Sequence, residues 1–256
     1  MSKKKRDLRN ENGKTKQGGA DQRRPDTSPF VYQEKKLDFE LNIREFEWTE
    51  KQKVFIETAL DKNTSYILCE APPGVGKTLL AVYIGLRLLQ QKRISNIYFV
   101  RLPMESASKG IGFLAGDIES KVGPYSQPMV DHLNELLPPS QISRLMKEGF
   151  IQTIPVGFIK GRTFNASLII VDEIEDLTTQ ECLLVMGRLG KFSKMIMTGD
   201  YEQANIRNSG FKIVYNLFND MEAMQKGIFC LQFDESDIMR NGLLSFVVKR
   251  FRQIRN

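Results

Sequence analysis

A short glycine-rich segment between a strand pattern and a helix pattern does most to limit the folds open to this chain. The apolar run YILC (66–69) predicts a buried strand, and LLAVYIGLRLL (79–89) predicts a helix just beyond it. Between them stands APPGVGKT (71–78), whose closing Gly-Lys-Thr is typical of a phosphate-binding loop, or P-loop. Amides of such a loop converge on phosphates, and the start of the following helix adds favourable partial charge. The segment therefore predicts an α/β fold with a phosphate site at a strand-to-helix turn.

The chemistry of this loop assigns roles to its residues. Gly74 and Gly76 let the backbone approach phosphate without Cβ clashes. Lys77 is expected to reach the β- and γ-phosphates, and the Thr78 hydroxyl to ligate magnesium. ATP and Mg²⁺ are therefore the expected ligands, although Ala71 replaces the usual first glycine. The predicted nucleotide-binding residues of the loop are Ala71, Pro72, Pro73, Gly74, Val75, Gly76, Lys77 and Thr78.

Further apolar runs alternate with helical patterns along the chain. Continuous apolar strands separated by helices predict a mainly parallel sheet with helices on both faces, where ligands bind beyond the carboxyl ends of the strands. Thr178 and Glu181 have the spacing of a capping box, and Ser140 is expected to cap another helix. The further predicted strands are 96–100, 150–156, 168–172, 194–199 and 228–233, and the predicted helices include 126–137, 140–148 and roughly 210–219.

Acidic residues stand where two of these strands end. Asp172 closes the fourth strand and is expected to hold magnesium or its water shell, while Glu173 is placed to orient or deprotonate the attacking water. The alternative is a strand that merely ends in acidic surface residues, because Glu175 and Asp176 follow.

The motif after the fifth strand combines Thr198, Gly199 and Asp200 with Gln203 three residues on. Alone, the first three residues predict a turn. Beside a P-loop, Asp200 and Gln203 are expected to sense the γ-phosphate.

Charge is concentrated at the two ends of the chain. Residues 1–29 carry nine Lys/Arg against four Asp/Glu, residues 240–256 carry five basic residues and no acid, and residues 30–239 have a net charge of −4. Residues 1–29 hold too few large apolar side chains to fold, so we expect a disordered basic tail followed by one domain over residues 30–256. Such a tail either holds nucleic acid through its phosphates or only keeps the protein soluble.

Other features exclude several classes of protein. No apolar run approaches the roughly 20 residues that span a bilayer, and no signal peptide is evident, so we expect no membrane association and a cytoplasmic location in a bacterium or phage-infected cell. Cys69, Cys182 and Cys230 are expected to be buried free thiols. His132 is the single histidine, which argues against a histidine zinc site or a Ser-His-Asp triad.

Taken together, these motifs resemble the PhoH-like family of P-loop ATPases, in a small phage or bacterial form related to superfamily one helicases. The resemblance covers roughly residues 46–251. VDEIED (171–176) parallels the family's DEAQN box, with Ile174, Glu175 and Asp176 in place of Ala-Gln-Asn. The other matching segments are RLPMESASKGIGFLAGDIESKVGPY (101–125), FIKGRTF (158–164), MIMTGDYEQ (195–203) and DIMRNGLLSFVVKRF (237–251).

The resemblance implies a single RecA-like domain that hydrolyses ATP, coupled to RNA or single-stranded DNA. It further implies that Gln52, within WTEKQ, reads adenine and that Arg240 acts as an arginine finger. Arg101 and Arg162 are each expected either to contact phosphate or nucleic acid or to form structural salt bridges. The changed DEAQN box lacks a glutamine that links nucleotide to nucleic acid, which weakens the helicase interpretation more than the ATPase interpretation.

Two other functions fit the same loop. One is a P-loop small-molecule kinase, although the TGD--Q element is not a kinase signature. The other is a nucleotide-dependent binding module with little turnover. For the ATPase we expect a homo-oligomeric ring, such as a hexamer, because superfamily one helicases need two RecA lobes and this chain has room for one.

Overall fold

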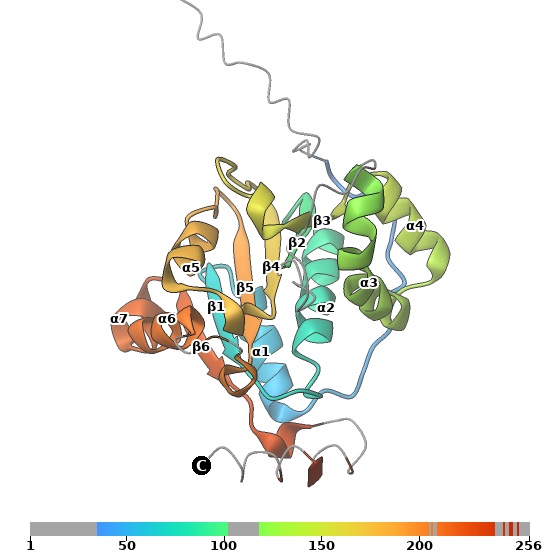
Figure 1. Ribbon diagram of the computed structural model, residues 1–256. Helices are drawn as coiled ribbons and strands as arrows, with labels where there is room; N and C mark the ends of the chain where they lie inside the picture. Colours follow the sequence, from blue (N-terminus) through green and yellow to red (C-terminus); the bar gives the residue numbers. More distant parts are fainter. Residues whose placement is uncertain are drawn as a thin grey trace, which may run out of the picture. The chain divides into compact units, whose positions relative to one another are not determined.

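A six-stranded parallel sheet forms the centre of the fold (Figure 1). The computed structural model describes residues 35–101, 118–204, 206, 209–238, 243, 246–247 and 250. The predicted basic tail (1–29) lies outside these residues. The strands are β1 (Tyr66–Glu70), β2 (Asn96–Arg101), β3 (Ile151–Pro155), β4 (Ser167–Asp172), β5 (Lys194–Gly199) and β6 (Ile228–Gln232), in the order β3-β2-β4-β5-β1-β6. All six predicted strands are present, and every strand pair is parallel.

Helices pack on both faces of the sheet (Figure 1), as predicted. Successive side chains of a strand point to opposite faces of the sheet, so a strand with apolar side chains on both faces needs helices on both. β4 is such a strand. Leu168 and Ile170 join the core beneath α1 and α2, whereas Ile169 and Val171 are buried on the other face. The helices are α1 (Glu50–Leu60), α2 (Lys77–Gln90), α3 (Ile118–Leu136), α4 (Pro139–Lys147), α5 (Thr179–Met186), α6 (Gly210–Phe218) and α7 (Met221–Gln225).

The helix starts confirm one predicted cap and contradict another. Thr178 and Glu181 form the predicted capping box at α5, in which Glu181 N–H donates to Thr178 Oγ1 (3.3 Å) and Thr178 N–H donates to Glu181 Oε2 (2.9 Å). The predicted cap at Ser140 is wrong, because α4 begins one residue earlier, at Pro139, after an extended Pro138. Proline suits the first helical position because its fixed φ is already helical and it has no N–H to satisfy.

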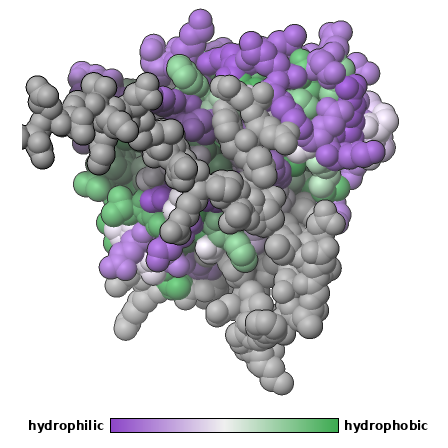
Figure 2. All heavy atoms as spheres, turned by 90° about the horizontal axis from the view of Figure 1, so that it is seen from above, coloured by the Kyte–Doolittle hydropathy of each residue, from purple (hydrophilic) through white to green (hydrophobic). Residues whose placement is uncertain are grey.

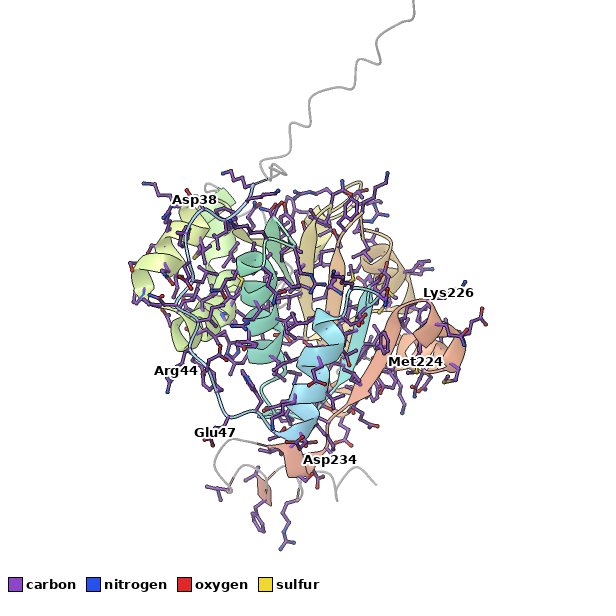
Figure 3. The ribbon with its side chains drawn as sticks, turned by 180° about the vertical axis from the view of Figure 1, so that it is seen from behind. Asp38, Arg44, Glu47, Met224, Lys226 and Asp234 are labelled. Carbon is purple, nitrogen blue, oxygen red and sulfur yellow. The ribbon has the colours of Figure 1, made fainter. Side chains whose placement is uncertain are left out.

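The segment before α1 runs alongside α2, as Figure 3 shows between Asp38 and Glu47. The carboxylate of Glu45 accepts a hydrogen bond from the Tyr83 hydroxyl (2.9 Å) and pairs with Arg87 (3.1 Å), both on α2. Leu41 is buried, and its carbonyl accepts from the Gln90 side chain (3.2 Å). These contacts fix the path of the chain into α1, which determines where Trp48 and Gln52 lie.

Beyond β6, the chain returns to α1. Lys51 on α1 pairs with Asp234 (2.5 Å) and Asp237 (2.8 Å), where Asp237 ends the short helix η4 (Glu235–Asp237). Figure 3 shows Asp234 next to the start of α1. The described chain that follows β6 is therefore anchored beside the helix that carries Gln52.

Some apolar side chains remain exposed on α6 and α7. Ile213 and Leu217 lie four residues apart on α6, Met221 and Met224 lie three apart on α7, and each is exposed. Figure 2 shows hydrophobic spheres gathered on the left, the side on which Figure 1 draws α5 to α7.

Two further sequence predictions can be compared with the fold. No helix in the described part of the chain combines the length and apolar character needed to cross a bilayer. The three cysteines are free, as predicted, and Cys69 and Cys182 are buried. Cys230 is only partly buried, because β6 lies at an edge of the sheet.

Candidate nucleotide site

The P-loop joins the end of β1 to the start of α2. Gly74 (φ 89°) and Gly76 (φ 80°) adopt left-handed conformations, which glycine accepts without strain. Ala71 is fully buried, and its N–H donates to the Gly199 carbonyl (3.0 Å). Among the described non-glycine residues, positive φ occurs only at Lys92, Ala166, Glu173 and Phe192. The backbone at Ala71 is therefore compatible with a side chain, which explains how alanine stands where the motif usually has glycine.

The end of β4 meets the start of α2 at Asp172. Its Oδ2 accepts a hydrogen bond from Thr78 Oγ1 (3.0 Å), and its Oδ1 accepts from Thr198 Oγ1 on β5 (2.5 Å). Asp172 is only 5 % exposed, so its orientation is fixed by these two hydroxyls. The structure thus brings together the two residues that the sequence assigns to magnesium.

Glu173, the predicted water-activating residue, is paired with Arg101. The guanidinium contacts both carboxylate oxygens, with Nη2 at 2.5 Å from Oε1 and Nε at 3.1 Å from Oε2. Arg101 is 9 % exposed and comes from the end of β2, next to β4 in the sheet. Glu173 has a φ of 56°, an unfavourable value for a residue with a side chain. Of the two roles open to Arg101 in the sequence, the structure shows the ion pair.

Glu175 is a second carboxylate two residues beyond Glu173, and the sequence did not single it out as a functional residue. It belongs to the short helix η2 (Ile174–Asp176), and its Oε2 accepts from the Asp200 N–H (3.3 Å). A Cβ at Gly199 would lie 2.9 Å from that oxygen, so glycine there permits the approach. Burial raises the pKa of Glu175 to about 7, although its own and the Asp200 amides and Lys77 favour the charged form. Its one signal in the sequence is that it replaces the glutamine of the family box.

Asp200 and Gln203 form a fixed pair after β5. Gln203 Nε2 donates to Asp200 Oδ2 (2.8 Å), and Asp200 Oδ1 accepts from the Glu202 N–H (2.9 Å). Asp200 is 2 % exposed, whereas the Gln203 side chain faces a cavity that it shares with the P-loop. Lys77 Nζ donates to the Ala71 carbonyl (3.3 Å) across the loop.

Gln52 holds the P-loop from the side of α1. Its Nε2 donates to the Val75 carbonyl (3.0 Å), and its Oε1 accepts from the Thr49 N–H in a capping box (3.0 Å). The side chain is 2 % exposed. One N–H and one acceptor lone pair of this amide remain beyond these two bonds.

A cavity of about 390 Å³ joins these groups. One wall of this cavity was not predicted from the sequence. It combines Phe46 and Trp48, whose rings lie 5.2 Å apart, with His132 and Glu135 of α3. His132 Nδ1 lies 3.1 Å from Glu135 Oε1. Two features of the sequence could have pointed to this wall: the aromatic residues near Gln52 and the three-residue spacing of His132 and Glu135. The cavity is lined by Phe46, Trp48, Gln52, Pro73, Gly74, Gly76, Lys77, Thr78, Leu79, His132, Glu135, Asp172, Glu173, Glu175 and Gln203.

Several residues predicted from the sequence are absent from the described lining of this cavity. Arg240 lies outside the described residues. Arg162 is placed over the Phe164 ring, with 5.0 Å from its guanidinium carbon to the ring centroid, and does not line the cavity. Four further predicted residues do not line the cavity because they are buried: Ala71, Pro72, Val75 and Asp200.

Comparisons with known proteins agree with these motifs. A family model described as PhoH-like protein matches residues 46–252. PhoH-like proteins of Synechocystis sp. and Bacillus subtilis are each 31 % identical to the chain, over 211 and 193 residues. These matches cover 81 % and 74 % of this chain but 62 % and 59 % of the relatives, so the chain spans less than two thirds of their length.

Among solved structures, the large terminase of a thermophilic bacteriophage aligns with 77 % of this chain and 48 % of its own, at 12 % identity and a TM-score of 0.48. The described part of the chain is a RecA-like α/β domain with a P-loop at the carboxyl ends of its parallel strands. Its motifs occur in the order and spacing of one family, whose model covers most of the sequence. The chain belongs to the PhoH-like family of P-loop proteins.

Proposed function

We propose that this protein hydrolyses ATP with magnesium, and one contact carries the proposal. Thr78 Oγ1 lies 3.0 Å from Asp172 Oδ2 at the mouth of the P-loop. A hydroxyl and a carboxylate are the hard oxygen donors that Mg²⁺ prefers. The left-handed Gly74 and Gly76 leave the loop free of the Cβ atoms that would obstruct phosphates. Both ligands therefore fit the residues present.

Each group would have a defined task. Thr78 and Asp172 would hold Mg²⁺, which supplies charge neutralisation at the β- and γ-phosphate oxygens when bound. Loop amides and Lys77 would bind the phosphates, and the second N–H and free lone pair of Gln52 would meet the adenine edge. Asp200 and Gln203 would sense the γ-phosphate, because Gln203 reaches the cavity while Asp200 fixes it to the end of β5.

Glu173 is our proposed acceptor for the proton of the attacking water. Its two oxygens face Arg101, and a carboxylate offers about four lone-pair sites, so the pair leaves room for a water. Arg101 would then keep the carboxylate in one orientation instead of withdrawing it. Glu175 is placed to shape the charge beside the same phosphate.

We further propose that hydrolysis is coupled to RNA or single-stranded DNA in a ring of identical subunits. One RecA-like sheet supplies one side of a nucleotide site, so a neighbour would supply the other side together with Arg240 as a finger. The exposed Ile213, Leu217, Met221 and Met224 support contact with a second copy, since solvent-exposed apolar surface of this kind marks interfaces.

The decisive experiment measures ATP turnover with and without RNA and single-stranded DNA. We expect magnesium-dependent turnover that a polynucleotide raises many-fold. Lys77→Ala should remove nucleotide binding, and Glu173→Gln should keep binding by calorimetry while turnover falls at least 100-fold, about what general-base catalysis contributes. Turnover unchanged in Glu173→Gln would refute the assignment of Glu173 and favour a binding module. Transfer of labelled phosphate to nucleosides or sugars would favour a kinase.

A further inference from the structure

The amino ends of the strands form a second surface, at the opposite end of the sheet from the P-loop. Four loops meet there, each entering a strand: they precede β1, β2, β4 and β5. Two adjoining hollows between these loops share Leu189, Gly190 and Phe192. The first is lined by Lys62, Thr64, Ser65, Leu88, Arg93, Ile94, Ser193 and Lys194 as well, and the second by Thr163, Asn165, Ala166 and Lys191.

The charge of these hollows differs from that of the rest of the domain. Among the described residues, their lining includes four cations, Lys62, Arg93, Lys191 and Lys194, and no Asp or Glu. Residues 30–239 as a whole carry a net charge of −4, so this concentration of positive charge is local. We call Lys62, Arg93, Lys191, Phe192 and Lys194 the amino-edge surface.

Two cations of the amino-edge surface, Arg93 and Lys194, donate hydrogen bonds to backbone carbonyls. Lys194, 9 % exposed, donates to the carbonyls of Asp61 and Thr64, the latter at 2.5 Å, and Arg93 donates to the Leu60 carbonyl (2.6 Å). None of the ion pairs found among the described residues involves these four cations. Lys62 and Lys191 are exposed and Arg93 is partly exposed, so their positive charge remains available to an anion, whereas Lys194 is buried and its burial lowers its pKa to about 8.

Phe192 places an aromatic ring between the two hollows. It is 85 % exposed, more than any other large apolar side chain in the described part of the chain. Its turn is locked against the segment before β4: Gly190 N–H donates to the Phe164 carbonyl (2.8 Å), and the Lys191 carbonyl accepts from Ala166 N–H (2.8 Å). A Cβ at Gly190 would lie 2.4 Å from the Phe164 carbonyl oxygen, so the turn fits only with glycine there.

Three residues in the loops of this edge have unfavourable backbone conformations. Four described non-glycine residues have positive φ: Glu173 lies at the nucleotide site, and Lys92, Ala166 and Phe192 lie in the loops before β2, β4 and β5. Residues in such conformations persist where the surrounding structure enforces them, and they gather at functional sites. The ring of Phe192 is thus held out by a rigid and unfavourable turn instead of folding back into the core.

We propose that the amino-edge surface binds a single-stranded polynucleotide, with its cations on the phosphates and Phe192 stacked on a base. Cations combined with an exposed aromatic platform are the two components of sequence-tolerant single-strand binding. The proposal rests on the nucleic-acid part of the proposed function and assigns it a place. It also separates the two ligands, with nucleotide at the carboxyl ends of the strands and polynucleotide at the amino ends.

The test uses the full chain and short fluorescent oligomers of thymidylate and of uridylate, with anisotropy measured over a range of salt. Phe192→Asn removes the ring, and asparagine tolerates positive φ better than phenylalanine, so the fold should not suffer. We expect binding to weaken about 5- to 150-fold, the loss typical of one stacked base. Lys191→Gln should lower the slope of log affinity against log salt by about 0.7.

Matched control variants make the same kinds of substitution at residues outside the amino-edge surface. Leu183→Asn alters another exposed apolar residue, on α5, and Lys147→Gln removes an exposed charge from α4. Both should bind like the wild type, and thermal melting should show all four variants folded.

Unchanged affinity in Phe192→Asn and an unchanged salt slope in Lys191→Gln would overturn the amino-edge surface, while turnover lost in Lys77→Ala would leave the ATPase proposal intact. A wild-type chain that binds neither oligomer at low salt would also overturn the surface. Conversely, Phe192-dependent binding by a chain without turnover would support the surface and refute the ATPase.

Discussion

Glu173 and Glu175 are two residues apart and line one cavity, yet their surroundings differ. Glu173 faces the guanidinium of Arg101 through both oxygens. Glu175 is partly buried, receives the Asp200 N–H, and interacts electrostatically with Lys77 and Glu173. Burial disfavours its charged form, which is why its pKa rises to about 7. A glutamine at this position would stay neutral at every pH, whereas the carboxyl group of Glu175 can titrate.

Glu175 should make stability depend on pH. Its carboxyl group binds a proton more tightly in the folded state (pKa about 7) than at its ordinary value of 4.5. The folded state therefore holds more protons between these values, and the free energy of unfolding should fall as pH rises through this range, by on the order of 2 kcal/mol. Glu175→Gln should remove that part of the slope. Urea unfolding at a series of pH values measures it.

Glu57→Gln on α1 is the matched control, because Glu57 is exposed and lies on another element. This variant should keep the wild-type slope. If Glu175→Gln also kept it, the carboxylate would be ionised throughout, and its burial would be compensated by the Asp200 amide and Lys77.

At the level of elements, the sequence predicted strands better than helix starts. β4 and β5 are buried along their whole length, and each contains a continuous apolar run (168–171 and 195–197) that local sequence alone reveals. The Thr178 cap was predictable because its partner, Glu181, lies three residues away. The start of α4 was not predictable in this way. The helix begins at Pro139, whose fixed φ is already helical, whereas Ser140 is of a residue type that usually caps a helix. The short α7 lacks a repeated pattern and was not predicted.

These two helix starts give a paired prediction. Thr178→Ala removes the side chain that accepts the Glu181 N–H, so it should lower the free energy of unfolding by about 1 kcal/mol. Ser140→Ala should change it by less than about 0.5 kcal/mol, because Ser140 is not the N-cap of α4. Chemical denaturation of both variants measures the difference. Equal losses would show that Ser140 caps α4 after all.

For the whole molecule, the candidate site divides into parts that sequence can and cannot foresee. Strand ends of a parallel sheet share one edge, so the strand pattern alone is enough to place Asp172 and the P-loop together. Trp48 and His132 could not be placed in this way, because their position depends on how the segment before α1 and the helix α3 pack against α2. The Arg101–Glu173 pair was equally hidden, since it requires β2 to lie beside β4.

The proposed ring predicts complementation between inactive subunits. Lys77→Ala lacks its own phosphate site but retains Arg240, and Arg240→Ala has the opposite defect. If Arg240 acts on a neighbour's nucleotide, a mixture should turn over ATP faster than the sum of the two variants measured separately. An arginine finger is worth about 10³–10⁵ in rate, so the gain should be easily measured.

The control mixes Lys77→Ala with Glu173→Gln, two defects that belong to the same subunit's site, and this mixture should stay inactive. A strictly monomeric chain in sedimentation, with specific turnover independent of protein concentration, would rule the ring out.

β5 begins at Lys194, within the amino-edge surface, and ends at Gly199, beside Asp200 and Glu175. Its six residues span roughly 20 Å at about 3.3 Å each. A strand buried along its whole length moves as a unit, because close-packed interiors resist compression. Two ligands at its ends must then obey thermodynamic reciprocity: whatever factor ATP imposes on the affinity for an oligonucleotide, the oligonucleotide imposes on the affinity for ATP.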